Sequence, residues 1–108
     1  MDRDFLERMR KARGTIRTVR VASASATELV GPSAARVSLT FFGTSVEYTL
    51  GSSTRVTSGQ GVIVPANSAT PVLWTVEYHG DLVQQGVYAI AASGTPDVTF
   101  IETILQGE

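Results

Sequence analysis

Residues 36–42 read Arg-Val-Ser-Leu-Thr-Phe-Phe, and this stretch decides the class of fold. Three apolar side chains, Val37, Leu39 and Phe41, alternate with the polar side chains Ser38 and Thr40. Successive side chains of a β-strand point to opposite faces of its sheet. The alternation therefore predicts a strand with its apolar face in a core and its polar face in solvent.

Six further segments resemble this one in length and composition, and turn residues such as Gly43, Gly59, Gly61 and Pro65 separate them. The predicted strands are residues 15–22, 36–42, 46–50, 62–64, 72–79, 87–91 and 98–104. About seven short strands at regular spacing are typical of an antiparallel sandwich or small barrel. We therefore expect an all-β fold, a single antiparallel β-sandwich or small jelly-roll-like barrel.

Three details of this pattern are less regular. In the first strand Ile16 is out of phase with Val19 and Val21, which predicts a bulge or a change of register. Residues 22–35 are rich in Ser and Ala and contain Gly31-Pro32, so we expect a loop there. Gly80-Asp81 is expected to form a tight turn after the strand over 72–79.

The N-terminus has a different pattern. Residues 2–12 place Phe5, Leu6 and Met9 on one side of a helix, and Gly14 is suited to end it. We therefore divide the chain into a basic, amphipathic helical arm over residues 1–14 and a sandwich domain over residues 15–108. A helix of about 11 residues is marginal alone, so its apolar side needs something to pack against.

The distribution of charged residues also differs between the N-terminal part of the chain and the rest. Residues 1–20 contain seven basic and three acidic residues, a net charge of +4, whereas residues 21–108 contain two basic and seven acidic residues, a net charge of −5. The arm either folds onto its own acidic body, stays solvated, or docks on an acidic neighbouring subunit. The candidate partner-interface residues are Phe5, Leu6, Arg8, Met9, Arg10, Lys11 and Arg13.

The composition also narrows the classes of function. The chain has no cysteine, which removes disulfides, thiol nucleophiles and cysteine metal ligands and favours assembly in the cytosol or stabilisation by oligomerisation. No run of about 18 apolar residues occurs, and the charged N-terminus lacks the apolar region of a signal peptide. We expect no membrane contact, no metal and no cofactor.

The sequence contains only weak signals of a catalytic site. His79 is the single histidine, and although Asp81 is near in sequence, no Gly-x-Ser-x-Gly nucleophile motif accompanies them. Asp97 with Glu102, or Glu77 with Asp81, could form a carboxylate pair, but solvated charge on the outer side of a sheet is the simpler interpretation. We expect no enzymatic activity and no catalytic residue. Nucleic-acid binding would rest on the arm alone, which lacks interleaved aromatic residues apart from Phe5.

Trp74 and Tyr78 allow a second hypothesis. On a strand, these aromatic residues lie on one face. If that face were exposed, the two rings could stack on a sugar ring. If it faces the other sheet, they belong to the core. The small polar residues that alternate with them favour the core.

An ordered set of segments resembles a known module. These are Arg36 to Phe42, then Val46-Glu-Tyr-Thr-Leu-Gly51, Val56-Thr-Ser-Gly-Gln-Gly-Val-Ile-Val64, Val87-Tyr-Ala-Ile-Ala-Ala-Ser-Gly94 and Asp97-Val-Thr-Phe-Ile-Glu102. The set resembles the small β-sandwich virion proteins of tailed bacteriophages, such as capsid decoration or cement proteins and head fibres. The arm is not part of that module, and the stretch Gly80–Gly86 is longer than usual for it.

This resemblance implies a virion structural protein, made in the host cytoplasm, that binds the exterior of the capsid and bridges capsid subunits. It implies the major capsid protein or another virion protein as partner and self-association, with a trimer favoured. The alternatives are a head-fibre, tail or neck component, and a glycan-binding module for host attachment.

Overall fold

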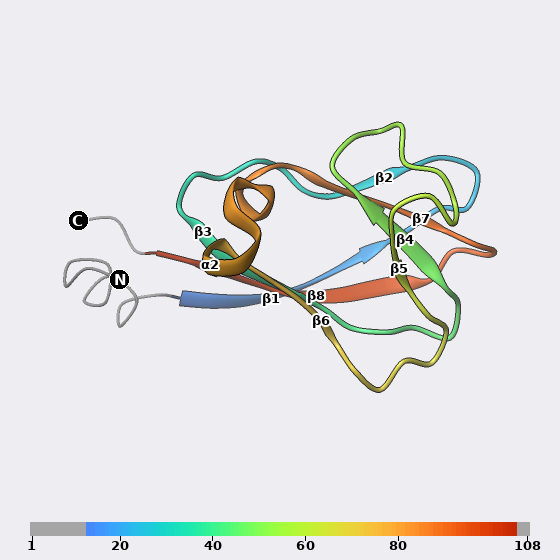
Figure 1. The fold of residues 1–108 in the computed structure, drawn as a ribbon. Coiled ribbons are helices and arrows are strands. Elements are labelled where there is room, and N and C mark those ends of the chain that lie inside the picture. The colour runs from blue at the N-terminus through green and yellow to red at the C-terminus, as the bar shows by residue number, and fades with distance from the viewer. Residues whose placement is uncertain (1–12, 106–108) are drawn as a thin grey trace.

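The computed structural model describes residues 13–105, which form two four-stranded antiparallel sheets packed face to face (Figure 1). An all-β sandwich is therefore confirmed, with eight strands in place of about seven. The elements are β1 (Arg13–Arg20), β2 (Thr27–Val30), β3 (Arg36–Phe41), β4 (Tyr48–Gly51), β5 (Val62–Val64), β6 (Val72–Thr75), the helical turns α2 (Val76–His79) and η1 (Gly80–Gln84), β7 (Val87–Ala91) and β8 (Asp97–Ile104).

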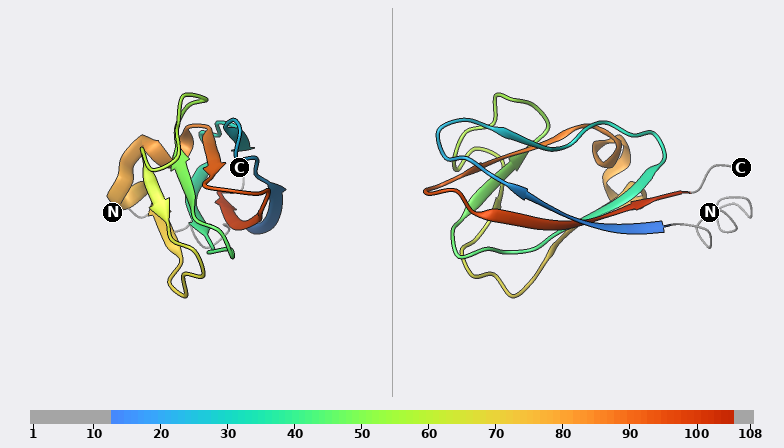
Figure 2. Two further views of the ribbon diagram at one scale, coloured as in Figure 1. Left: turned by 90° about the vertical axis from the view of Figure 1, so that its right-hand side faces the viewer. Right: turned by 180° about the vertical axis from the view of Figure 1, so that it is seen from behind.

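The strand pairs are nested along the chain. The first sheet has the order β1-β8-β3-β6 and the second has the order β2-β7-β4-β5. Thus β1 pairs with β8, β2 with β7, β3 with β6 and β4 with β5, so that each pair encloses the next pair along the sequence. The longest strands, β1 and β8, run side by side along the molecule (Figure 2).

The core lies between the sheets and is built by the predicted alternation. Leu39 and Phe41 of β3 are fully buried, and the Phe41 ring lies 5.2 Å from the Trp74 ring in an edge-to-face arrangement and 5.8 Å from the Phe100 ring. Tyr48 of the second sheet is also fully buried. Its hydroxyl donates a hydrogen bond of 2.6 Å to the carbonyl oxygen of Phe42, and burial raises the pKa of the phenol well above its usual value.

The first strand differs from the sequence prediction in two ways. β1 pairs with β8 in continuous register from Arg13 opposite Ile104 to Arg20 opposite Asp97, so the expected bulge is absent from it. Ile16 is out of phase because it points to the outer side of the sheet, where it is 71% exposed. β1 also begins at Arg13, two residues before the first strand was expected to begin. The expected helix over residues 2–12 lies outside the described residues.

A strand occurs where a loop was expected. β2 occupies Thr27–Val30 within the segment 22–35 and pairs with β7 through a register shift between Glu28 and Val30. Leu29 and Val30 are buried. Packing of these two side chains, rather than local propensity, makes this short segment a strand.

The segment after β6 is helical, which corrects the prediction of a strand over residues 72–79. The Thr75 hydroxyl accepts a hydrogen bond from the backbone N–H of Tyr78 at 3.3 Å and so caps α2. The expected tight turn at Gly80-Asp81 is instead the start of η1, which buries Val83 in the core. This helical segment covers one end of the first sheet (Figure 1).

The aromatic cluster predicts a large difference between two adjacent residues. We expect Phe41→Ala to lower the free energy of unfolding by about 3–5 kcal/mol, because it leaves a cavity beside Trp74 and Phe100. Phe42→Ala, at a side chain that is 36% exposed, should cost about 1 kcal/mol or less. Chemical denaturation followed by the fluorescence of the single tryptophan measures both, and equal losses would contradict the described core.

Candidate functional site

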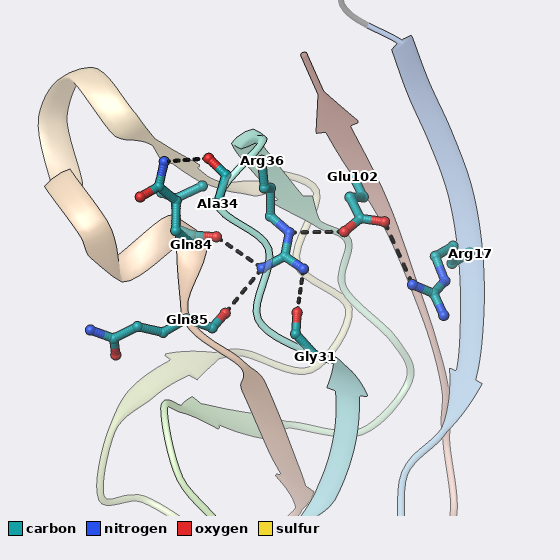
Figure 3. Close-up of polar contacts among 8 residues, drawn as sticks. Arg17, Gly31, Ala34, Arg36, Gln84, Gln85 and Glu102 are labelled. Carbon is teal, nitrogen blue, oxygen red and sulfur yellow. Dashed lines mark hydrogen bonds and ion pairs between the residues drawn. The ribbon is translucent and has the colours of Figure 1, made fainter. Parts of the chain in front are cut away.

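Arg36 is the most unusual side chain of the sandwich, because it is fully buried. Its Nε donates a hydrogen bond of 2.8 Å to Oε2 of Glu102. Its Nη1 donates to the carbonyl oxygens of Val83 and Gln85, both at 3.0 Å, and its Nη2 donates to the carbonyl oxygen of Gly31 (Figure 3). One guanidinium thus joins β3, β8, the loop before β3 and the end of η1.

Glu102 lies between two arginines. Its Oε1 is 3.5 Å from Nη1 of Arg17, a half-exposed side chain on β1 (Figure 3). The guanidinium carbon of Arg17 lies 5.8 Å from the centre of the Phe100 ring. A buried charge is costly unless it is paired and hydrogen-bonded. Within the described residues, every buried side-chain nitrogen and oxygen has a hydrogen-bond partner. The cluster of Arg17, Arg36 and Glu102 therefore fixes the position of five segments, the four joined by Arg36 and β1.

The pair of Asp97 and Glu102 considered in the sequence is not formed. Glu102 is occupied by Arg36, whereas Asp97 is exposed and its Oδ1 lies 3.2 Å from Nε of Arg20. Sequence reasoning missed this use of Glu102, because nothing local to Arg36 marks it as buried. The alternation groups Arg36 with Ser38 and Thr40 on the solvent side, so it gives no signal that Arg36 is buried.

His79 has a local role at the helical turn. Its Nδ1 accepts a hydrogen bond of 3.0 Å from the backbone N–H of Thr75, four residues earlier. In the part of the chain that the structure describes, no group of His, Cys, Asp and Glu side chains is arranged to hold a metal ion. No helix among those residues has the length and hydropathy needed to cross a membrane.

Trp74 and Tyr78 do not share a face. Trp74 is buried against Phe41, which confirms its place in the core, whereas Tyr78 is on α2 and 81% exposed. The prediction of a common aromatic face is therefore wrong, because the strand ends at Thr75. A sugar-stacking platform made of both rings is not formed.

The candidate arm interface is only partly described. Phe5, Leu6, Arg8, Met9, Arg10 and Lys11 lie outside the described residues. Arg13 is exposed at the start of β1, opposite Ile104, and lines a shallow hollow with Thr15, Ile104 and Leu105. β1 therefore begins at the end of the sandwich where β8 ends (Figure 2).

The outer face of the first sheet has an unusual composition. Alternation and register place the side chains of β1, β8, β3 and β6 that point away from the core on this face. Apart from the Arg20–Asp97 pair at one end, these side chains are small, uncharged or apolar. We call the following residues the threonine face: Gly14, Ile16, Thr18, Ser38, Thr40, Leu73, Thr75, Thr99, Ile101 and Thr103.

An apolar row crosses the middle of the threonine face. Ile16 is opposite Ile101, Ile101 is opposite Thr40, and Thr40 is opposite Leu73. Ile16 is 71% and Leu73 is 53% exposed. A solvated sheet face normally carries charged residues, so an uncharged face with an apolar centre is suited to contact with another macromolecule.

Comparisons with known proteins add little beyond the fold. The sequence matches no protein-family model and no curated protein. Among solved structures it is similar to a chain from a Bacillus structure described as "Bacillus endospore appendages form a novel family of disulfide-linked pili". The identity is 11%, the TM-score is 0.48, and the match covers 89% of this chain and 88% of that chain.

The buried cluster predicts that Arg36 is essential for stability. We expect Arg36→Met to lower the free energy of unfolding by about 3–5 kcal/mol, because Glu102 and three carbonyl groups lose their partner. Arg20→Met, which breaks the exposed pair with Asp97, should cost at most about 1 kcal/mol.

Denaturant unfolding of both variants and of the double variant Arg36→Met/Glu102→Leu measures this. The double variant should recover part of the loss, because it removes the buried carboxylate that has lost its closest partner. An Arg36→Met variant as stable as Arg20→Met would refute the role of the cluster.

Proposed function

We propose that this chain is a structural protein of a tailed-bacteriophage particle, a capsid decoration or cement protein that binds the exterior of the capsid. The observation that carries the proposal is the threonine face, an uncharged surface over four strands. Such a protein acts through contact area and shape, with the major capsid protein or another virion protein as partner.

Topology supports the same proposal. The nested pairing of eight strands in two sheets is that of a jelly roll, an architecture that recurs in viral capsid and lectin domains. The segments that carry the resemblance to phage virion proteins include β3, β4, β5, β7 and β8, so the resemblance covers strands of both sheets. Fold alone does not define a function, and the threonine face supplies the surface on which this function would act.

Rigidity supports it as well. The buried bonds of Arg36 attach the helical segment and the loop before β3 to the first sheet. A surface that is ordered before binding loses less conformational entropy when it binds. A rigid subunit that bridges capsid subunits would resist their separation, because several contacts must break together.

Binding to particles is predicted to depend on the threonine face. Ile101→Lys places a charge in the middle of the apolar row without entering the core, and we expect it to weaken binding to particles lacking the protein by at least about tenfold. Ser58→Lys, in the exposed loop before β5, serves as the matched control and should bind like the unaltered protein. Co-sedimentation of each folded variant with particles measures the affinity.

Mass spectrometry of purified particles tests the position on the virion. Hundreds of copies per particle support decoration of the capsid, whereas a handful would place the chain in a head fibre, the neck or the tail. Complete absence of the chain from the particles would contradict the proposal. Removal of residues 1–12 leaves β1 whole and separates the contribution of the arm from that of the threonine face.

A further inference from the structure

β1 is an edge strand with one side open. It pairs along its whole length with β8, and within residues 13–105 no strand pairs with its other side. An edge strand presents unpaired N–H and C=O groups that can accept another strand. Natural monomers usually protect such an edge with short strands, bulges, proline or charged side chains.

The usual protection is missing from β1. It has eight residues, its register with β8 has no shift, and it contains no proline. Two of its three arginines do not guard the edge in the ordinary way, because Arg17 is paired with Glu102 and Arg20 with Asp97, both on β8. These two side chains are thus directed back over their own sheet.

We propose that β1 pairs antiparallel with β1 of a second copy of this chain, about a two-fold axis at Ile16, and joins two first sheets into one of eight strands. The proposal does not depend on the identity of the particle. In an antiparallel pair, residues directly opposite each other point to the same face of the sheet. The two-fold axis must therefore place one residue opposite the same residue of the second copy. An axis midway between two neighbouring residues would oppose side chains that point to different faces.

The charges of β1 select that residue. An axis at Ile16 places Arg13 opposite Val19 and Arg17 opposite Thr15, so no two arginines are directly opposed. An axis at Arg17 would oppose the two copies of Arg17, and an axis at Thr15 would oppose Arg13 and Arg17. Like charges directly opposite each other destabilise a strand pair. Axes further from the centre of β1 would pair fewer residues.

The apolar row gives an independent reason for the same axis. Pairing at Ile16 brings the more exposed ends of the two apolar rows together. The row of one copy, from Leu73 to Ile16, then continues into the row of the second copy. Ile16, which is 71% exposed in the single chain, gains a lateral contact with Ile16 of the second copy. The threonine face doubles in area and stays on one side of the joined sheet.

The symmetry of this proposed contact leads to a different oligomer from the trimer favoured by the sequence. A contact between two copies of the same strand is isologous and closes as a pair, so it produces a dimer and not a trimer. One strand pair is a small interface, and stable complexes bury about 1,200 Å² or more. The association of the isolated protein is therefore weak and dependent on concentration.

A single cysteine tests the axis, because the chain has none of its own. In Ile16→Cys the two Cα atoms would lie about 4.5–5.5 Å apart, within the range of a disulfide. In Thr18→Cys, on the same face of the same strand, they would lie roughly 13 Å apart, since four residues separate them along the strands. Mild oxidation of the full-length variants, followed by intact-mass measurement, should give a linked dimer for Ile16→Cys and at least tenfold less for Thr18→Cys.

Linkage that is equal in both variants, stronger in Thr18→Cys or absent from both overturns the proposal. Leu73→Cys separates a further arrangement, because linkage stronger there than in Ile16→Cys would show that the faces, and not the edges, meet. Sedimentation of cysteine-free protein provides a second measurement. Ile16→Lys should weaken self-association at least tenfold, whereas Leu73→Lys, in the same row but three strands away, should leave self-association unchanged. Loss of self-association in both variants contradicts the β1 pair. An unaltered protein that is strictly monomeric also contradicts it.

Discussion

The structure depends on one buried charge. The guanidinium of Arg36 is removed from water and is stabilised only because Glu102 and three carbonyl oxygens surround it. Such an arrangement is favourable when all its bonds are made and unfavourable when some are missing. The loop ending at Arg36, the helical segment up to Gln85 and the strand β8 must therefore reach their positions together. Arg17 extends the same constraint to β1 through its contact with Glu102.

This constraint explains how the two sides of the first sheet differ. On the inner side, the sheet is covered partly by the second sheet and partly by the helical segment, which Arg36 attaches through the carbonyl groups of Val83 and Gln85. The outer side is left with threonine, serine and aliphatic residues and with one exposed ion pair at its end. A rigid scaffold behind an uncharged face is the physical basis of the proposed virion role. The open edge of β1 offers a way to enlarge that face by repetition of the same chain.

The sequence predicts the fold where the alternation of side chains is local and regular. β3, β5, β7 and β8 lie where the pattern places them, and Val37, Leu39 and Phe41 are buried as expected. The prediction failed where tertiary contacts or a cap override the pattern. Val72 to Tyr78 alternates like one strand, but the Thr75 hydroxyl caps a helix in its middle. β2 has only four residues and depends on the burial of Leu29 and Val30 for its place in the sheet.

The candidate site was harder to predict than the fold. The partners of Arg36 come from residues 31, 83, 85 and 102, and only the folded chain brings them together. The threonine face requires the register between four strands, which no local pattern contains. The arm residues from Phe5 to Lys11 lie outside the described residues, so their proposed role stays a prediction.

Native-state hydrogen exchange tests most directly whether the buried charge holds these segments together. The backbone N–H of Ser33 donates to the carbonyl oxygen of Gln84, and that of Gln85 donates to the carbonyl oxygen of Leu82, so both amides report on the segments that Arg36 joins. If Arg36 couples these segments to the sheet, both amides exchange with the same free energy of opening as the central amides of β3 and β8. Exchange of Ser33 and Gln85 that is orders of magnitude faster than exchange in β3 would show that the segments open independently, and would contradict the account.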